Sequence, residues 1–575
     1  MSSQPTTKNT ATAYQVTALA LMAMVIGVLT STVATGFVAA VQWLNDYLYI
    51  SPISRVKLYY SVLLSSVVTI TVTTLGGLLT GLLLHYLSNE KRPLGPPDTI
   101  LAVQLNKELP DTRSGVVSTL ASIISLGCGA SVGQYGPLVY LGALVGNIIR
   151  KCQITSDDTR NIMIACGVAA AISSAFSAPI AGLVFAHEVI LRHFSMRAFA
   201  PTTIASAASY IFSDFTFDIE PLFLVDFVGV EHGVEFLLFV LLGLFSACLA
   251  LIFISSLLHG QKWAKSIPLP LFIKPALAGL ILGCCALLVP EILGIGTETM
   301  RFATIEGAFS LPELLSIMLM KLVVTVLCIS FGFVGGVFSP LLLIGILFGA
   351  FNWMLINDVF ELINSGITVY AICGMMAVTS PVIGAPLTCI LIVFELTRNY
   401  ELTIAAMVSV VFSNLLVAKV YGRSLFDSQL LSRGFNLAEG RDQAILQTTT
   451  VQDVMRNDFP IACIDESLTN IFNRLDSSPW SEVYIIENNG KFLGTLRPTA
   501  TSSAHLKDCL HSPRLLFSTS TTLWQAMESL EGFVGDAVPI VDDEGKLIAV
   551  VTEADVISAY MRVVHMIQKE ERASS

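Results

Sequence analysis

The chain has 575 residues, of which 54% are hydrophobic and 13% are charged, and its formal net charge is −11. This apolar excess excludes an ordinary soluble globular protein and indicates a chain that crosses a membrane several times. The acidic charge balance argues against nucleic acid as a partner. The eleven cysteines are scattered without paired spacing, so neither a metal site nor a disulfide framework is expected.

The first three quarters of the chain predict a membrane domain. Residues 1–12 are polar and are expected to be disordered, and apolar stretches of membrane length recur over residues 13–434. The first stretch, near Tyr14, is too long for a signal-peptide core and indicates a retained membrane helix. The chain fits a bacterial inner membrane, which we favour, or an organelle membrane, with the N-terminus and the C-terminal region cytoplasmic.

Many of the apolar segments are short or interrupted by glycine and proline. Such breaks occur at Gly95-Pro96-Pro97, Gly136-Pro137, Pro179, Gly335-Gly336, Pro340, Pro381 and Pro386. Non-helical backbone at membrane depth is tolerated only where it is packed in protein or lines a polar cavity. Broken helices in both halves of a membrane protein are typical of a transporter with a binding site near the bilayer midplane.

A weak internal repeat supports this interpretation. The stretch from Gly127 to Gly142 and the stretch from Gly332 to Gly345 share a glycine-rich lead-in, a proline at a helix start and a small residue shortly after it. The first of these stretches contains the run Gly133–Pro137. It predicts a helix that begins inside the bilayer, where unpaired amides and the helix dipole favour an anion.

The composition becomes polar after Arg433, which indicates a soluble region. We expect a linker at 435–448, two similar α/β modules at 449–504 and 505–567, and a short tail at 568–575. Each module offers a strand, a polar turn and a second strand, with flanking helices. The turns lie at Asn488-Asn489-Gly490 and Asp543-Glu544-Gly545.

These motifs, in this order, resemble those of the CLC family of chloride channels and chloride/proton exchangers, followed by a pair of CBS domains. The resemblance implies an all-α polytopic membrane domain of broken, tilted helices in an inverted repeat, with a C-terminal α/β tandem CBS module. It also implies a homodimer in the lipid bilayer, with one pathway for chloride or a similar small anion in each subunit. The anion-pathway positions are Leu94, Gly95, Pro97, Gly133, Gln134, Tyr135, Gly136, Pro137, Gly336, Val337, Phe338 and Phe426.

The chain departs from the family pattern at the positions that carry protons. Tyr135 stands where the family has a gating glutamate, and Val189 stands at the inner proton-glutamate position, next to Glu188. Gln134 replaces an arginine, and Leu94 and Phe426 replace a serine and a tyrosine that offer hydroxyls to the anion. A tyrosine titrates near pH 10 and is a poor proton carrier. We therefore expect passive, channel-like anion conduction with Tyr135 as the gate.

Several alternatives stay open at this point. The chain is either a conductor of this kind, a chloride/proton antiporter with an unconventional route, or a nucleotide-sensing membrane protein with a vestigial pore. Glu188 is expected in a structural hydrogen bond or, with His187, in a substitute proton route. Nothing in the sequence indicates an enzyme, and no cofactor is required.

The resemblance to CBS domains bears on the tail. Thr552 and Asp555 match the nucleotide pattern of these domains, in which the threonine contacts phosphate and the aspartate binds ribose. This implies an adenine-nucleotide site for ATP, ADP or AMP, with a purely structural, dimer-stabilising role as the alternative.

Overall fold

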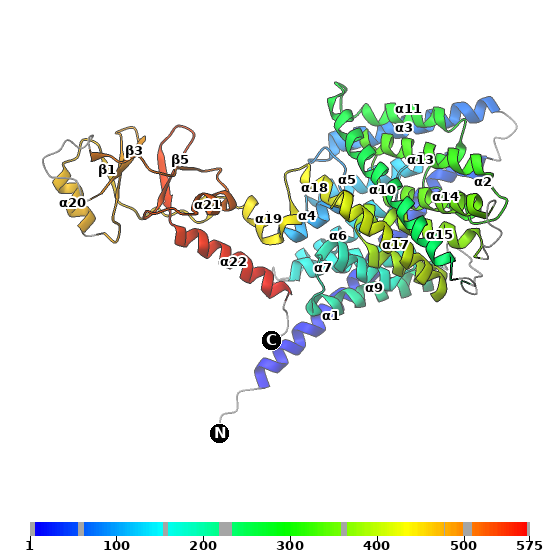
Figure 1. Cartoon of the computed structure of the whole chain (residues 1–575), viewed down its shortest axis with the longest axis horizontal. Helices are drawn as coiled ribbons and strands as arrows, with labels where there is room; N and C mark the ends of the chain where they lie inside the picture. The colour runs from blue at the N-terminus through cyan, green and yellow to red at the C-terminus, as the bar shows by residue number, and fades with distance from the viewer. Residues whose placement is uncertain are drawn as a thin grey trace. The chain divides into compact units, whose positions relative to one another are not determined.

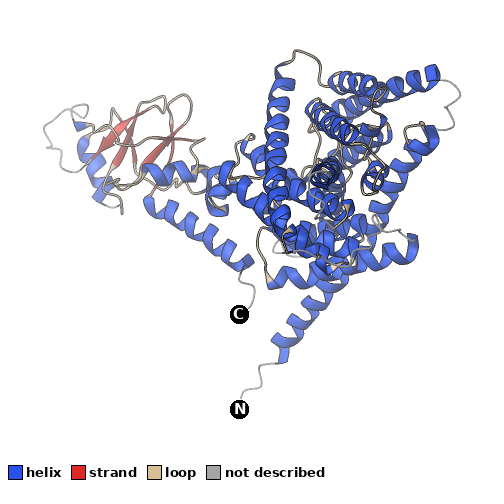
Figure 2. Cartoon of the chain, turned by 45° about the vertical axis from the view of Figure 1, so that its right-hand side comes forward, coloured by secondary structure: helices blue, strands red, loops and turns tan. Residues whose placement is uncertain are grey.

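The computed structural model describes residues 6–55, 62–152, 159–217, 230, 233–357, 365–476, 478–497 and 509–571. The chain divides into two compact units, one ending at Gly434 and one spanning Phe435–Arg572. Strands occur in the second unit, whereas the described part of the first unit consists of helices and loops (Figure 2).

The first unit is a bundle of helices of very unequal length (Figure 1). Among the residues that the structure describes, six helical stretches are long and apolar enough to cross a membrane. In order, the helices are α1 Thr6–Tyr47, α2 Pro52–Arg55, α3 Val62–Leu87, α4 Pro96–Gln104, α5 Thr112–Gly127, α6 Tyr135–Cys152, α7 Arg160–Phe176, α8 Pro179–Phe185, the π-helix η3 Ala186–Leu191, α9 Met196–Phe217, α10 Glu235–Ser266, α11 Lys274–Cys285, η4 Pro290–Ile292, α12 Thr297–Ala303, α13 Leu311–Ser330, α14 Phe338–Asn357, α15 Ile367–Ile383, α16 Pro386–Thr397, α17 Tyr400–Val420 and α18 Leu425–Leu431.

The N-terminal segment differs from the expectation. Residues 6–12 already form the first turns of α1, so the expected disorder up to residue 12 is wrong for this part. The physical reason is that a helix propagates at little cost once its apolar part is formed.

The expected repeat is present in the packing of the first unit. Helix α6 packs on α7 as α14 packs on α15, and in both pairs glycines bring the backbones together. A methyl group added at Gly142 would lie 2.3 Å from the carbonyl oxygen of Gly167, and one at Gly345 would lie 2.6 Å from that of Gly374. Helices α7 and α15 then end alike, at Ser177 and Gly384 in the left-handed conformation, and each is followed by Ala-Pro.

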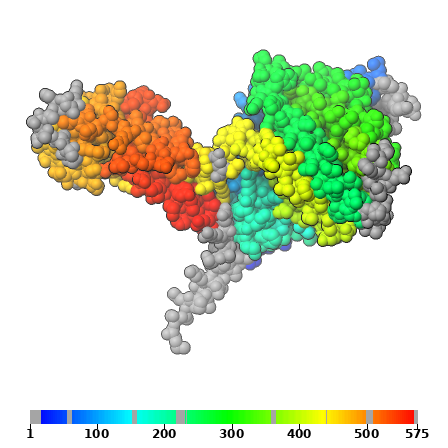
Figure 3. Space-filling view, viewed as in Figure 1, coloured from blue at the N-terminus to red at the C-terminus, as the bar shows by residue number. Residues whose placement is uncertain are grey.

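The second unit contains two small sheets with the same order. Strands β1 Ile461–Cys463, β2 Val483–Ile486 and β3 Phe492–Leu496 form one sheet, and β4 Phe517–Ser518, β5 Val538–Val541 and β6 Leu547–Val551 form the other. In each, the first pair is parallel and the second pair antiparallel. The expected duplicated α/β module is therefore present, and its halves pack on each other through Tyr484 and Val550. Figure 3 shows the two halves against each other, in yellow-orange and in darker orange to red.

The segment 435–448 is not a free linker. It contains the short helix η5 Leu437–Glu439 and helix α19 Arg441–Thr448. Leu446 is buried, together with Val451, in the core of the second sheet, against Phe517 and Val538. The apolar Ala-Ile-Leu run in α19 is the reason, since it gains by leaving water. The remaining elements are η6 Val451–Asp453, α20 Leu468–Asp476, α21 Leu523–Ser529 and α22 Glu553–Glu571.

Two of the expected boundaries cannot be compared with the structure in full. The boundary between the modules at 504/505 and the final residues 572–575 lie outside the described residues. Helix α22 continues to Glu571, past the expected end of the second module at 567.

Candidate functional site

The two glycine-proline motifs lie directly against each other. The amide of Gly133 donates to the carbonyl oxygen of Gly336, and the amide of Gly336 donates back to that of Gly133, both at 2.6 Å. A methyl group at Gly136 would lie 2.7 Å from the Cα of Gly336, so the backbones approach as only glycine permits. Segments about 200 residues apart in the chain thus meet with local two-fold symmetry.

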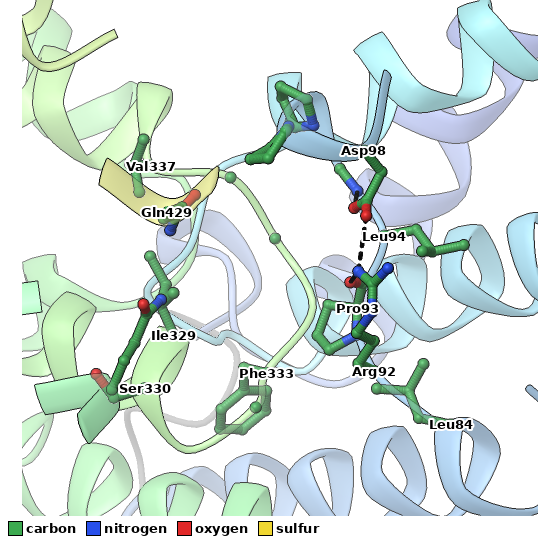
Figure 4. Close-up of a pocket in the computed structure, with 18 of the residues that line it drawn as sticks. Leu84, Arg92, Pro93, Leu94, Asp98, Ile329, Ser330, Phe333, Val337 and Gln429 are labelled. Carbon is green, nitrogen blue, oxygen red and sulfur yellow. Dashed lines mark hydrogen bonds and ion pairs between the residues drawn. The ribbon is translucent and has the colours of Figure 1, made fainter. Parts of the chain in front are cut away.

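Three helices begin at one cavity of about 450 Å³ beside this junction (Figure 4). Helix α4 starts after Gly95, whose amide donates to the Asp98 carboxylate at 3.0 Å, and prolines occupy its first positions. Helices α6 and α14 start at Tyr135 and Phe338. Of the predicted pathway residues, the cavity is lined by Leu94, Gly95, Pro97, Tyr135, Gly136, Gly336, Val337, Phe338 and Phe426.

Basic side chains surround the same cavity. Five line it, namely Lys91, Arg92, Lys265, Lys274 and Arg433, and among the described lining residues Asp98 is the single carboxylate. Asp98 is 4% exposed and forms an ion pair with Arg92 at 2.8 Å (Figure 4). It forms another with Arg433 at 2.9 Å. The lining therefore has a positive net charge, which concentrates anions.

Tyr135 closes one end of the cavity with an aromatic cluster. Its ring stacks on Phe176 with centroids 3.9 Å apart and planes at 13°. It also meets Phe338 edge-on at 5.3 Å, and Phe176 and Phe338 lie 5.2 Å apart. The side chain is 7% exposed. Aromatic pairs of this kind contribute about 0.5–1.5 kcal/mol each beyond burial, so the cluster holds the ring in place.

A second cavity, of about 910 Å³, begins on the other side of the motif. Gln134 lines this cavity, whereas its neighbour Tyr135 lines the first. The Gln134 amide donates to Ser339 Oγ at 3.3 Å, while its side-chain oxygen is buried without a hydrogen-bond partner. The peptide between residues 134 and 135 therefore separates the two cavities.

Val189 and Glu188 lie in the π-helix η3, away from both cavities. Val189 is buried. The Glu188 carboxylate accepts hydrogen bonds from the amides of Leu387 and Thr388, both at 2.9 Å, and from the Thr388 hydroxyl at 2.7 Å. It thus caps the N-terminus of α16. His187 is also held at both ring nitrogens, by His193 O at 3.0 Å and by Thr202 Oγ1 at 3.2 Å.

Glu395 makes the reciprocal contact. Its carboxylate accepts from the amides of Ile180 at 2.8 Å and Ala181 at 2.7 Å, at the N-terminus of α8. Helix α16 thus caps α8 through Glu395, and the π-helix η3, which directly follows α8, caps α16 through Glu188. This exchange gives Glu188 and Glu395 the same structural contact in the two repeats.

In the tail, Thr552 and Asp555 form the first turn of α22. Asp555 Oδ2 accepts from the amide and hydroxyl of Thr552, at 3.1 and 2.6 Å, and the Asp555 amide donates back to Thr552 Oγ1. Arg456 holds the same carboxylate through three bonds of 2.8–3.0 Å. Burial raises the pKa of Asp555, but the bonds from Arg456 and Thr552 outweigh it and hold that pKa below its usual range.

The structure also brings in residues that sequence reasoning missed. Phe176 is the stacking partner of Tyr135, and Lys265, Lys274 and Arg433 reach the first cavity from distant elements. The pair Lys91-Arg92 stands shortly before Leu94 in the sequence and could have indicated basic side chains at the cavity. The others carry no local signal, because only tertiary packing brings them to the cavity.

Comparison with known proteins agrees with this geometry. The family model described as voltage gated chloride channel matches residues 76–418, and a CBS domain model matches residues 506–562. The H(+)/Cl(−) exchange transporter ClcA of Salmonella paratyphi B is 29% identical over 427 residues, which cover 72% of this chain and 88% of that protein.

Solved structures show the same fold. A slow cyanobacterial Cl−/H+ antiporter superposes with a TM-score of 0.66 at 22% identity, covering 72% of this chain and 97% of that one. A eukaryotic CLC transporter superposes with a TM-score of 0.61 at 19% identity, covering 93% and 97%. The family match covers more than half of the chain and includes both glycine-proline motifs. The chain therefore belongs to the voltage gated chloride channel (CLC) family and is an integral membrane protein with a C-terminal CBS region.

Proposed function

We propose that this protein conducts chloride, or a similar small anion, passively across the membrane, with Tyr135 as the gate. The observation that carries the proposal is the uncharged aromatic cluster of Tyr135, Phe176 and Phe338 at the motif where Tyr135 lines the first cavity and its neighbour Gln134 lines the second. An exchanger needs a carboxylate that moves between proton and anion. A tyrosine ring at this point can admit or block an anion, but it stays neutral.

The first cavity is suited to hold the anion. Three helix N-termini and five basic side chains line it, and the ammonium of Lys274 is tied to the carbonyl oxygen of Ala264 at 2.6 Å. Amides of Val337 and Phe338 supply the central contacts in this proposal, without a full countercharge beside the ion. Dipoles bind an anion weakly enough for rapid release. Leu94 and Phe426 add no hydroxyl, so the proposal includes a reduced central affinity.

The proton route has no evident carrier. Val189 has no titratable group, and Glu188 is committed to three hydrogen bonds at the start of α16. His187 is committed at both nitrogens. Moving a proton through Glu188 would disturb the cap of α16, and moving one through His187 would break its contacts with His193 and Thr202.

The experiment is chloride efflux from liposomes that contain the purified full-length chain, with internal pH recorded at the same time. We expect chloride to leave without proton movement, and an imposed proton gradient to drive no chloride. Tyr135→Glu restores a carboxylate and should make the efflux pH-dependent, while coupling stays absent because Val189 is unchanged. Proton movement in fixed ratio to chloride in the wild type would refute passive conduction.

The second candidate function is chloride/proton exchange, which the similarity to ClcA and to solved antiporters favours. It requires a route through residues other than 135 and 189. The same efflux measurement separates the two functions, and Glu188→Gln tests the carboxylate next to position 189. Loss of proton coupling in that variant, with chloride flux retained, would establish exchange.

The proposal includes a homodimer. Ile180 on α8 and Leu387 on α16 are 47% and 52% exposed, beside the exchanged caps, and offer an apolar face for a second copy.

The proposal also places the N-terminus and the tail in the cytoplasm of a bacterium. The tail binds adenine nucleotides only after Arg456 releases Asp555. Cross-linking in membranes tests the homodimer, and nucleotide titration of the full-length chain tests the tail.

A further inference from the structure

The two cavities that flank the gate carry charges of opposite sign. Basic side chains line the first, as described above. The second is lined by the carboxylates of Asp46, Glu291 and Glu298, and no lysine or arginine is among its described lining residues. The remaining polar lining consists mainly of hydroxyls and of the amides of Gln42, Asn45 and Gln134.

The carboxylates come from both sides of the second cavity. Asp46 lies near the end of α1, where its carboxylate accepts from Ser51 Oγ at 2.6 Å. Glu291 and Glu298 flank the loop 293–296, which forms part of the opposite wall. An anion that passes through this cavity to Gln134 therefore travels between negative charges.

One buried cation lies behind that wall. Lys321 on α13 is 0% exposed, and its ammonium donates to the carbonyl oxygens of Ile292 at 2.9 Å and Gly294 at 2.7 Å. The amide of Gly294 in turn donates to the carbonyl of Gly129 at 2.9 Å, in the lead-in to the gate motif. Lys321 thus fixes the wall, and its single charge offsets only part of the three carboxylates.

The first cavity reaches the last residues of the membrane unit. Ser432 and Arg433 line it, and the unit ends at Gly434. It is therefore the mouth on the side of the tail. The second cavity is lined by Val38, Gln42 and Asp46 from the last turns of α1.

We propose that the acidic cavity makes anion conduction asymmetric, with Asp46, Glu291 and Glu298 as the residues that determine the asymmetry. The inference rests on the proposed passive conduction. When the voltage drives chloride from the tail side, chloride enters through the basic cavity, which raises its local concentration. When the voltage drives chloride from the other side, it enters through the acidic cavity, where the carboxylates lower its local concentration. Coulomb's law gives about a twofold depletion for one charge at about 10 Å in water, hence about five- to tenfold for three.

The experiment measures voltage-driven chloride flux in both polarities on oriented vesicles. Liposomes with about one dimer each are captured through a C-terminal tag, which selects those with the tail outside. Chloride is equal on both sides, at about 20 mM or about 500 mM. The triple variant combines Asp46→Asn, Glu291→Gln and Glu298→Gln in the second cavity. A separate variant, Lys265→Gln, changes the first cavity. Glu401→Gln is the control, since Glu401 is an exposed carboxylate of α17 that lines neither cavity.

We expect the wild type to pass more chloride from the tail side at low salt, and the triple variant to raise the opposite flux about five- to tenfold. The difference in flux between the wild type and the triple variant should shrink below about twofold at high salt, because the Debye length falls to a few ångströms. Lys265→Gln should lower only the flux from the tail side. A flux ratio that the triple variant leaves unchanged at low salt would overturn the inference while passive conduction stands. No chloride flux in either polarity, in the wild type and in Tyr135→Ala, would overturn both.

Discussion

Replacing Tyr135 by alanine tests the gate directly. For the ring to leave its position, it must give up the stack on Phe176 and the edge contact with Phe338. At about 0.5–1.5 kcal/mol per aromatic pair, the two contacts favour the closed position by about 1–3 kcal/mol. That free energy corresponds to about a 5- to 150-fold preference for the closed state. Tyr135→Ala should therefore raise chloride flux by about one to two orders of magnitude.

The assay is chloride efflux from liposomes, started with valinomycin and read with a chloride electrode. Phe176→Ala removes the stack on Tyr135, together with the Phe176–Phe338 contact, but leaves the edge contact between Tyr135 and Phe338. Because Tyr135 then loses one of its two aromatic contacts, the flux should rise about 2- to 12-fold. Tyr140→Phe is the matched control, because Tyr140 lies on the same helix and its buried hydroxyl has no hydrogen-bond partner. If Tyr135→Ala, folded and dimeric, conducts no faster than the wild type, the ring does not gate the path.

Four further predictions concern contacts around the site and in the tail. Glu188→Gln and Glu395→Gln should each lower thermal stability by a similar amount, about 1–2 kcal/mol, because each removes a charged cap from a helix N-terminus; clearly unequal losses would argue against equivalent roles. Gly336→Ala should destabilise the chain by about 1–3 kcal/mol in denaturant, since its methyl group would lie 2.7 Å from the Gly136 amide nitrogen. Arg456→Ala should increase the affinity for adenine nucleotide in calorimetry, and an unchanged affinity would show that the ion pair does not occupy the site. Because the pKa of Asp555 is depressed in the fold, its stabilising contribution is present above pH about 4 and is lost as the pH falls further, which thermal scans of wild type and Asp555→Asn can check.

The sequence predicted the class of fold and the positions of the helix starts well. The cause is local: proline is well suited to the first turn of a helix, so a proline that follows glycine or another small residue favours a helix start. The starts at Pro96, Tyr135, Phe338 and Pro386 follow this rule. The expected linker at 435–448 missed α19 for the opposite reason, since α19 is stabilised by a core whose other buried members, apart from Val451, lie about 70 residues or more away.

The sequence by itself determined that this is a membrane protein of broken helices with two glycine-proline motifs, and that no carboxylate stands at positions 135 and 189. Both follow from composition and residue identity, which need no coordinates. The tertiary structure alone decided that Gly133 and Gly336 pair, that Phe176 stacks on Tyr135, and that Glu188 and Glu395 exchange caps. It also decided that basic residues gather at one cavity and acidic residues at the other. Such juxtapositions depend on packing between elements far apart in the chain, for which neighbouring residues carry no signal.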